Sequence, residues 1–233
     1  MRSIGLVLGI AALCVPALAL PILPLGTIDV SYQGYSWELG PTGAYPPSLG
    51  QAGNVLHAIG QVIKILDGTA VEIYDPEDEG AEMTFYLHGL VSQGATSGAK
   101  DAWLTDYLGG SLEVYFDDTP DYDPATGHDN YSGVTDGLLW LSADVLTFST
   151  QFDDVLGQGS FTGTFQVTGG IAANCLTDVW TWGASTTGDV PAGWTYMHSI
   201  VGDLYGECIP EPGTFVLLGS GLLGLVGVAG RRR

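Results

Sequence analysis

Apolar and polar residues alternate in several short stretches through the middle of the chain. Between residues 28 and 33, Ile28, Val30 and Tyr32 alternate with polar neighbours, and residues 112–116 and 161–167 repeat the pattern. A period of two places one set of side chains on a dry face of a β-strand and the other set on a wet face. These stretches therefore predict strands. Apolar runs ended by Gly, Asp or Pro predict further strands at residues 62–66, 71–74, 84–87, 138–141 and 145–148.

Many short strands with frequent turn residues indicate a mainly β body. Such a body is an antiparallel sandwich or a barrel-like fold, and we expect a sandwich or jelly-roll-like arrangement. Gly109-Gly110 and Gly169-Gly170 are expected to form turns between strands. Only Ala52 to Ile59 hints at a helix. The body is long enough to bury one sizeable core.

An apolar segment near the start of the chain does not follow the strand pattern. Arg2 is followed by an apolar run from Ile4 to Val15 and by Ala17-Leu18-Ala19, a small-x-small sequence. A positive start, a short apolar region and small residues at the cleavage site are typical of a secretory signal peptide. We therefore predict a signal peptide at residues 1–19 and an exported mature chain.

A second apolar segment, Thr214 to Gly230, contains 17 uncharged residues. As an α-helix it would span about 25 Å, close to the lower limit for crossing a bilayer. Arg231, Arg232 and Arg233 follow it, and basic residues stay on the cytoplasmic side, so these arginines would stop translocation and leave the body outside. We predict a single transmembrane helix at this end.

A Pro-Glu-Pro triplet, Pro210, Glu211 and Pro212, precedes this helix. The prolines keep the backbone extended and open to an enzyme. The extended motif, apolar helix and basic end indicate a processing signal at residues 207–233, after a secreted acidic domain at residues 20–206. An ordinary membrane anchor is the alternative.

The triplet, the Gly-rich apolar helix and the three arginines together resemble the PEP-CTERM sorting signal of Gram-negative bacteria. The resemblance implies recognition by exosortase, a membrane-embedded cysteine transpeptidase that removes the tail. By this resemblance, Pro210, Glu211 and Pro212 are recognition residues and not catalytic ones. It also implies a transient inner-membrane anchor, followed by release to the cell surface or the extracellular matrix.

The charge of the chain is strongly acidic. Asp and Glu number 26 and Lys and Arg 6, which gives a formal net charge of −20. After removal of residues 1–19 and 210–233, 25 acidic residues remain against two basic ones, Lys64 and Lys100. Such a surface repels phosphate backbones and anionic lipids. Nucleic acid is therefore excluded as a partner, whereas divalent cations could be attracted.

The chain contains three cysteines, of which Cys14 would leave with the signal peptide. An even pair, Cys175 and Cys208, would remain. In an exported chain an even pair suggests a disulfide. Two separate thiols are the alternative.

A turn-rich segment around Pro120 and Pro124 carries closely spaced carboxylates. Hard oxygen ligands on such a loop can hold Ca²⁺. The EF-hand spacing is absent, and a solvated acidic turn is the alternative. Calcium is the one cofactor that the sequence suggests. The candidate ligands are Asp117, Asp118, Asp121, Asp123 and Asp129.

No motif points to an enzyme. The four histidines have no zinc-site spacing, and no nucleophile elbow, Walker loop or dinucleotide fingerprint occurs. We therefore expect a non-enzymatic surface or matrix protein associated with biofilm or exopolysaccharide. The alternatives are a carbohydrate-binding or calcium-dependent adhesion module, and a secreted hydrolase whose carboxylates one sequence does not reveal. Trp180, Trp182 and Trp194 are expected in the core, although they could also form a sugar-stacking platform.

Overall fold

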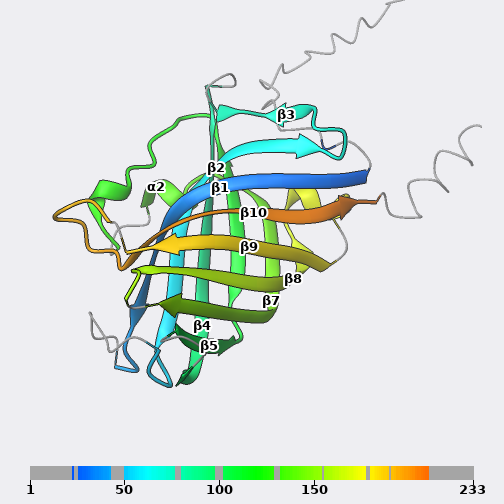
Figure 1. Ribbon diagram of the computed structural model, residues 1–233. Helices are drawn as coiled ribbons and strands as arrows, with labels where there is room; N and C mark the ends of the chain where they lie inside the picture. Colours follow the sequence, from blue (N-terminus) through cyan, green and yellow to red (C-terminus); the bar gives the residue numbers. More distant parts are fainter. Residues whose placement is uncertain are drawn as a thin grey trace, which may run out of the picture.

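The fold is that of a computed structural model, which describes residues 23, 26–42, 50–76, 80–97, 102–128, 132–153, 155–176, 179–188 and 190–209. Within these residues ten strands form one antiparallel sheet (Figure 1). The strands are β1 (Gly26–Leu39), β2 (Val55–Asp67), β3 (Glu72–Tyr74), β4 (Glu82–Ser97), β5 (Ala102–Leu108), β6 (Ser111–Asp117), β7 (Leu138–Asp153), β8 (Gln158–Gly169), β9 (Val179–Thr187) and β10 (His198–Cys208). Between the strands, the described residues include the short helical segments η1 (Pro124–Thr126), α2 (Ser132–Thr135) and η2 (Ile171–Asn174).

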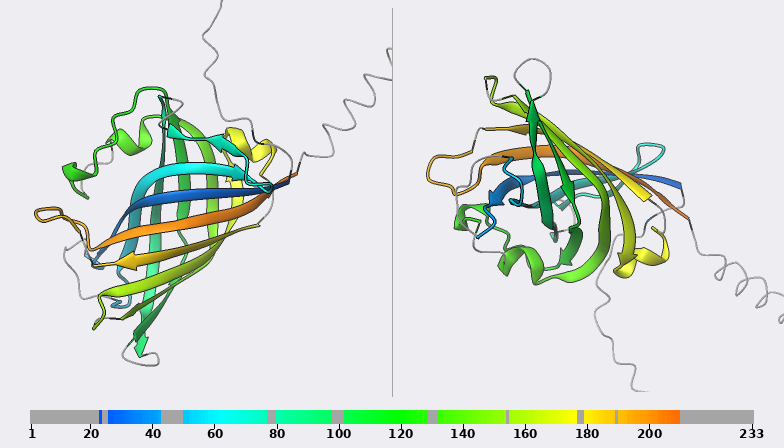
Figure 2. Two further views of the ribbon diagram at one scale, coloured as in Figure 1. Left: turned by 45° about the horizontal axis from the view of Figure 1, so that its top comes forward. Right: turned by 90° about the horizontal axis from the view of Figure 1, so that it is seen from below.

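The sheet closes on itself as an eight-stranded antiparallel barrel. Neighbours in the barrel follow chain order, and the ring closes because β1 pairs with both β2 and β10. β5 and β6 share one position between β4 and β7, with β5 along one half of these strands and β6 along the other. β3 is an additional short strand beside β2. The two views of Figure 2 show the sheet curving around and α2 lying outside it.

The two ends of the barrel differ in what they carry. At one end Gly26 pairs with Cys208, so the chain enters and leaves the barrel there; we call this the terminal end, and it lies on the right in Figure 1. At the opposite end, β1 finishes at Leu39 and β10 begins at His198. We call this the distal end.

The prediction of a mainly β antiparallel body is confirmed, but the sandwich or jelly roll is wrong. Alternation reports only that each strand has one dry face, and this is true of a sandwich and of a barrel alike. The difference lies in whether the first and last strands meet. The eleven residue pairs from Gly26↔Cys208 to Ser36↔His198 join them, and this long-range pairing leaves no local pattern in the sequence.

One further local prediction is wrong, and two predicted strands are confirmed in position but form a single strand. The helix expected from Ala52 to Ile59 is absent, since β2 begins at Val55 and pairs with β1 and β4. The strands expected at 138–141 and 145–148 are parts of the single strand β7. Ala143 between them is buried, so the dry face continues, with bulges where the register shifts. In both places tertiary hydrogen bonding overrides the local signal.

The glycine pairs have different roles. Gly109-Gly110 interrupts the shared barrel position between β5 and β6, and both residues have positive φ, the region that glycine favours. Because β5 and β6 both run antiparallel to β4 and β7, this break does not reverse the chain. Gly169-Gly170 ends β8, and η2 follows it before β9. The second pair therefore lies in a true connection between antiparallel strands.

One further glycine pair, Gly34 and Gly60, allows two strands to approach closely. The two residues face each other in β1 and β2. A Cβ at Gly34 would collide with the carbonyl oxygen of Ile59, and a Cβ at Gly60 would collide with that of Gln33. Strong bending of strands in a small barrel commonly requires glycine at such positions.

The barrel interior is filled by aromatic and aliphatic side chains. Trp182 of β9 lies at the centre of this core and is 2% exposed. Trp180 on the same strand is also buried, so these two tryptophans pack in the core, as predicted, and cannot form a sugar-stacking platform. Trp194 lies apart from them, half-buried in a second cluster on the outside of the barrel, with Trp37, Ile59, Val134 and Tyr196.

A disulfide joins Cys175 and Cys208 at the terminal end. Cys175 directly follows η2, and the two Cα atoms lie 4.7 Å apart, within the range that a disulfide spans. The backbone N–H of Ile209 also donates to the carbonyl of Cys175 at 2.8 Å. The bond therefore ties the end of β10 to the segment that connects β8 and β9.

Replacing both cysteines, as Cys175→Ser with Cys208→Ser, is expected to lower the free energy of unfolding by about 3–4 kcal/mol. The bond closes a loop with a sequence separation of 33, and its loss gives the unfolded chain more freedom. Urea unfolding with and without dithiothreitol measures the effect. Reductant should destabilise the parent and leave the double variant unchanged; equal curves for parent and variant would mean that the thiols are not bonded.

Candidate functional site

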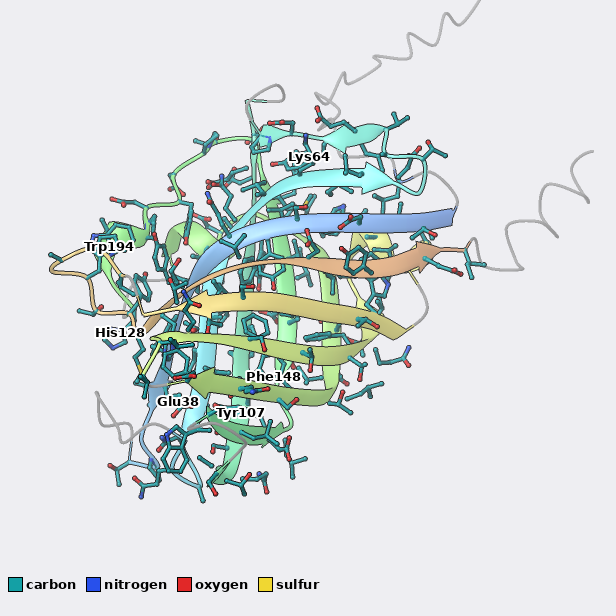
Figure 3. The ribbon with its side chains drawn as sticks, viewed as in Figure 1. Glu38, Lys64, Tyr107, His128, Phe148 and Trp194 are labelled. Atoms are coloured by element: carbon teal, nitrogen blue, oxygen red, sulfur yellow. A yellow bond between two sulfur atoms is a disulfide. The ribbon has the colours of Figure 1, made fainter. Side chains whose placement is uncertain are left out.

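A cavity of about 270 Å³ lies inside the distal half of the barrel. All eight barrel positions contribute to its wall, through β1, β2, β4, β5, β7, β8, β9 and β10. Figure 3 shows three of the lining residues, Glu38, Tyr107 and Phe148, gathered in this part of the barrel. The lining is made of Ser36, Glu38, Gly50, Leu56, Ala58, Leu87, Ala95, Trp103, Thr105, Tyr107, Phe148, Thr150, Gln151, Phe152, Phe161, Thr186 and His198.

A buried carboxylate forms the polar part of the wall. Glu38 is 4% exposed. Its Oε2 accepts hydrogen bonds from Asn54 Nδ2 at 2.7 Å and from the backbone N–H of Gly50 at 3.3 Å. Its Oε1 accepts one from the hydroxyl of Tyr107 at 2.5 Å. Three donors directed at two oxygens match an ionised carboxylate.

The environment keeps Tyr107 protonated. Burial raises the pKa of the Tyr107 hydroxyl well above its usual range, and the charge of Glu38 raises it further. The hydroxyls of Thr105 and Thr150 also hydrogen-bond to this oxygen, which acts in the opposite direction. Tyr107 is therefore a hydrogen-bond donor to Glu38 at neutral pH.

The rest of the wall is largely apolar. Leu56, Ala58 and Leu87 lie on one side, and the rings of Phe148 and Phe161 lie on another. Both rings contact Trp182, with centroid separations of 6.3 and 5.4 Å. Trp182 and its neighbours thus separate the cavity from the packed core in the terminal half.

The cavity opens at the distal end. The exposed members of its lining lie there, including Gln151 and Trp103, which is 45% exposed. Next to them the rings of Phe152 and His198 have centroids 4.6 Å apart. The arrangement can accept a compact molecule with an apolar body and a polar group that reaches the Glu38 carboxylate.

A second group of polar side chains lies on the outer surface near the terminal end. One carboxylate oxygen each from Glu82, Asp117 and Asp121 fall within 4.8 Å of one another. Glu82 is 3% exposed and accepts from the backbone N–H groups of Asp121 and Tyr122 at 3.0 and 3.1 Å. Glu82 therefore fixes the start of the segment after β6 against the barrel.

The five predicted calcium ligands do not all converge. Asp117 and Asp121 come together, with Glu82 at the start of β4 as the third member. Asp118 accepts from the hydroxyl of Thr119, and Asp123 caps η1 by accepting from the backbone N–H of Ala125. Asp129 lies outside the described residues. The structure therefore uses Asp118 and Asp123 in local turns.

Glu82 is expected to make stability depend on pH. Burial raises the pKa of Glu82 above its usual value near 4.5, and the charges of Asp121 and Asp117 add to this, against the two backbone donors. Because the folded state binds this proton more tightly than the unfolded state, the contribution is complete below about pH 4.5 and is lost as the pH rises through the folded pKa. Urea unfolding from pH 4 to 7 should show a flatter profile in Glu82→Gln than in the parent.

A matched control for this prediction is Glu207→Gln, because Glu207 is exposed on β10. It changes the formal charge by the same amount without touching the segment after β6. If Glu82→Gln and Glu207→Gln alter the pH profile equally, Glu82 is not the source of the dependence.

His57, His88 and His128 lie near one another on the outside of the barrel, and His198 lies apart from them. His57 stacks between Trp37 and Tyr86 on the outside of the barrel, and burial, followed by the charges of His88 and His128, lowers its pKa to about 4. His128 is hydrogen-bonded to Thr195 at 2.7 Å. His198 instead lines the interior cavity.

The sequence analysis missed Glu38 and Tyr107. A signal for Glu38 was present, because the inward positions of β1 are the even-numbered ones from Ile28 onward, and extending this alternation reaches Glu38. A glutamate on a dry face needs buried donors, and this makes it a candidate site residue. Tyr107 had no comparable signal, since its pairing with Glu38 joins β5 to β1.

The predicted processing segments lie outside the described residues. This applies to residues 1–19, to Pro210, Glu211 and Pro212, to the apolar segment 214–230, and to Arg231, Arg232 and Arg233. In the described part of the chain, no helix has the length and apolar character needed to cross a bilayer.

Comparison with protein families identifies the end of the chain. Residues 209–233 match the family described as the PEP-CTERM protein-sorting motif. The resemblance inferred from the triplet, the apolar helix and the arginines is confirmed. Comparisons with curated proteins and with solved structures give no match.

Proposed function

The chain is a PEP-CTERM protein, and since its sorting motif implies export with a transient membrane anchor and targeting to exosortase, we propose that it is a non-enzymatic binding protein of the cell surface or extracellular matrix. Its ligand is a small molecule held in the distal cavity. The observation that carries this proposal is the cavity itself, a space of about 270 Å³ with one buried carboxylate in a largely apolar wall.

The position of the cavity is compatible with use at a membrane or surface. The sorting motif begins at residue 209, directly after β10 ends at the terminal end. The cavity opens at the distal end, away from this attachment. A molecule still held by its tail, or fixed to the surface near it, would therefore present the opening outward.

The polar groups favour binding over catalysis. Glu38 is held by three donors, and the raised pKa of Tyr107 keeps this hydroxyl protonated at neutral pH, so that it is neither available as a general base nor effective as a general acid. A hydrogen-bonded pair of this kind orients a ligand without the need for proton transfer. These contacts support a binding function.

Fragment screening by ligand-observed NMR tests the proposal on the secreted barrel. Neutral and charged fragments with one ring should bind the parent, and Ala95→Trp should abolish that binding, because Ala95 lines the cavity and is half-buried near its opening. Val155→Trp, at an exposed turn outside the lining, is the matched control. Fragments that bind the parent and Ala95→Trp equally would refute a ligand site in the cavity.

Association with exopolysaccharide or biofilm is part of the same proposal, supported by the sorting motif. The alternative is a carbohydrate-binding or calcium-dependent adhesion module, and the cluster of Glu82, Asp117 and Asp121 favours its calcium-dependent form. Retention on the host's own polysaccharide, measured with and without EDTA, separates these. Retention lost in EDTA and in Glu82→Gln supports calcium; retention unaffected by EDTA supports direct association; no retention in either condition removes the adhesion module.

A further inference from the structure

The charge and shape of the distal cavity carry an inference about its ligand class. We propose that the cavity selects small organic monocations, in which a protonated amine meets Glu38 and an apolar, ring-sized body lies against Phe148 and Phe161. This inference rests on the proposed binding function and adds the chemistry of the ligand to it.

The first step is the charge of Glu38. None of the basic side chains in the described residues forms an ion pair with it; Lys64, the one described lysine or arginine, pairs with Glu72 at 2.7 Å on the outside of the barrel. A buried carboxylate without a cation is costly, and hydrogen bonds offset only part of that cost. A bound cation would supply the missing charge, so binding is favoured for a ligand that carries one.

The second step is the capacity of the carboxylate for another donor. Oε2 already accepts from Asn54 and Gly50, whereas among the described residues only Tyr107 donates to Oε1. A carboxylate oxygen has two lone pairs, so Oε1 can accept one further hydrogen bond. Glu38 and Tyr107 both line the cavity, and an ammonium group there would take this position.

The third step is the size and surface of the remaining space. A cavity of roughly 150 Å³ accepts benzene, so 270 Å³ accommodates one aromatic ring with a short side chain. The wall supplies Phe148, Phe152, Phe161 and Trp103 around this space. Their ring faces attract cations in addition to packing against apolar groups.

The fourth step is the field of the whole protein. Its formal net charge is −20, which raises the local concentration of cations and lowers that of anions. This field is not specific for the cavity, so the test has to separate it from the local effect of Glu38.

Calorimetric titration with three probes of matched size separates the effect of Glu38 from that of the net charge. 2-Phenylethylamine is cationic at pH 7, 2-phenylethanol is neutral and phenylacetate is anionic. The proteins are the secreted barrel, Glu38→Gln, Glu207→Gln and Ala95→Trp. Glu207 is exposed at the terminal end, so Glu207→Gln removes the same charge as Glu38→Gln without changing the cavity.

The amine is expected to bind the parent about 10- to 100-fold more tightly than the alcohol, which is the range for a hydrogen bond to a charged group. Phenylacetate should bind most weakly. Glu38→Gln should remove most of the preference for the amine and leave the affinity for the alcohol within about threefold. Glu207→Gln should behave as the parent, and Ala95→Trp should bind none of the probes.

Two results would overturn the ligand class alone: equal affinity for amine and alcohol in the parent, or an unchanged amine affinity in Glu38→Gln. With either result, if Ala95→Trp still abolishes binding of the probes, the proposed binding function of the cavity stands. If no probe binds the parent, the monocation class is refuted, and the fragment screen decides separately whether the cavity binds anything. If Glu38→Gln fails to fold, equal affinity of the amine and the alcohol for the parent still refutes the ligand class.

Discussion

Mature protein recovered from its native host is expected to lack residues 1–19 and to end at or near Pro210 to Pro212. The sorting motif at residues 209–233 implies an exosortase substrate, and removal of its tail also removes Arg231, Arg232 and Arg233. Intact-mass analysis measures both ends at once. In a strain without exosortase, nearly all molecules of the protein should instead end at Arg233.

Variants of the chain test the same processing step within one strain. Replacing Pro210, Glu211 and Pro212 together by alanine should block removal of the tail, because these residues are the proposed recognition element. Glu207→Gln lies outside the matched residues, on β10, and should be processed as the parent. A parent chain that still ends at Arg233 in a strain with functional exosortase would contradict the assignment and leave an ordinary single-pass anchor.

The sorting motif could be predicted from the sequence because its parts are read in linear order. A triplet, an apolar helix and a basic end are local features, and they need no folded context to be recognised. Strand positions were predicted for a related reason, since alternation within one strand reflects the local pleat. Residues 28–33, 112–116 and 161–167 all lie within strands of the barrel.

Closure of the barrel and assembly of the cavity could not be predicted in this way. Both depend on pairs that are distant in sequence, such as Glu38 with Tyr107, which are 69 residues apart. The acidic cluster is a further example, because Glu82 joins Asp117 and Asp121 through the pairing of β4 with β6. A single sequence gives the residue types at such sites, but the register of the strands decides which of them meet.

The packed core in the terminal half of the barrel contributes both to the stability of the fold and to the wall of the cavity. Trp182 contacts five aromatic rings, those of Tyr32, Phe85, Phe148, Phe161 and Phe165, at centroid distances of 5.0 to 6.3 Å. Two of these rings line the cavity, and the other three belong to the packed part of the core. Trp182 therefore supports both rings that separate the cavity from the packed part of the core.

Trp182→Ala is expected to lower the free energy of unfolding by about 3–5 kcal/mol. The substitution removes the largest side chain at the centre of the barrel and leaves a space that the closed sheet cannot collapse to fill. Urea unfolding measures the loss. Trp103→Ala, at a 45% exposed position, is the matched control and should cost less than about 1 kcal/mol.

Trp182→Phe distinguishes aromatic packing from hydrogen bonding at this position. Within the described residues, Trp182 Nε1 has no hydrogen-bond partner, so the indole N–H contributes nothing that phenylalanine would lose. Phenylalanine keeps a ring among the five neighbours, and its cost should therefore be less than half that of Trp182→Ala. Equal costs for the two variants, or a cost for Trp182→Ala no larger than that for Trp103→Ala, would show that Trp182 does not hold the two halves of the barrel interior together.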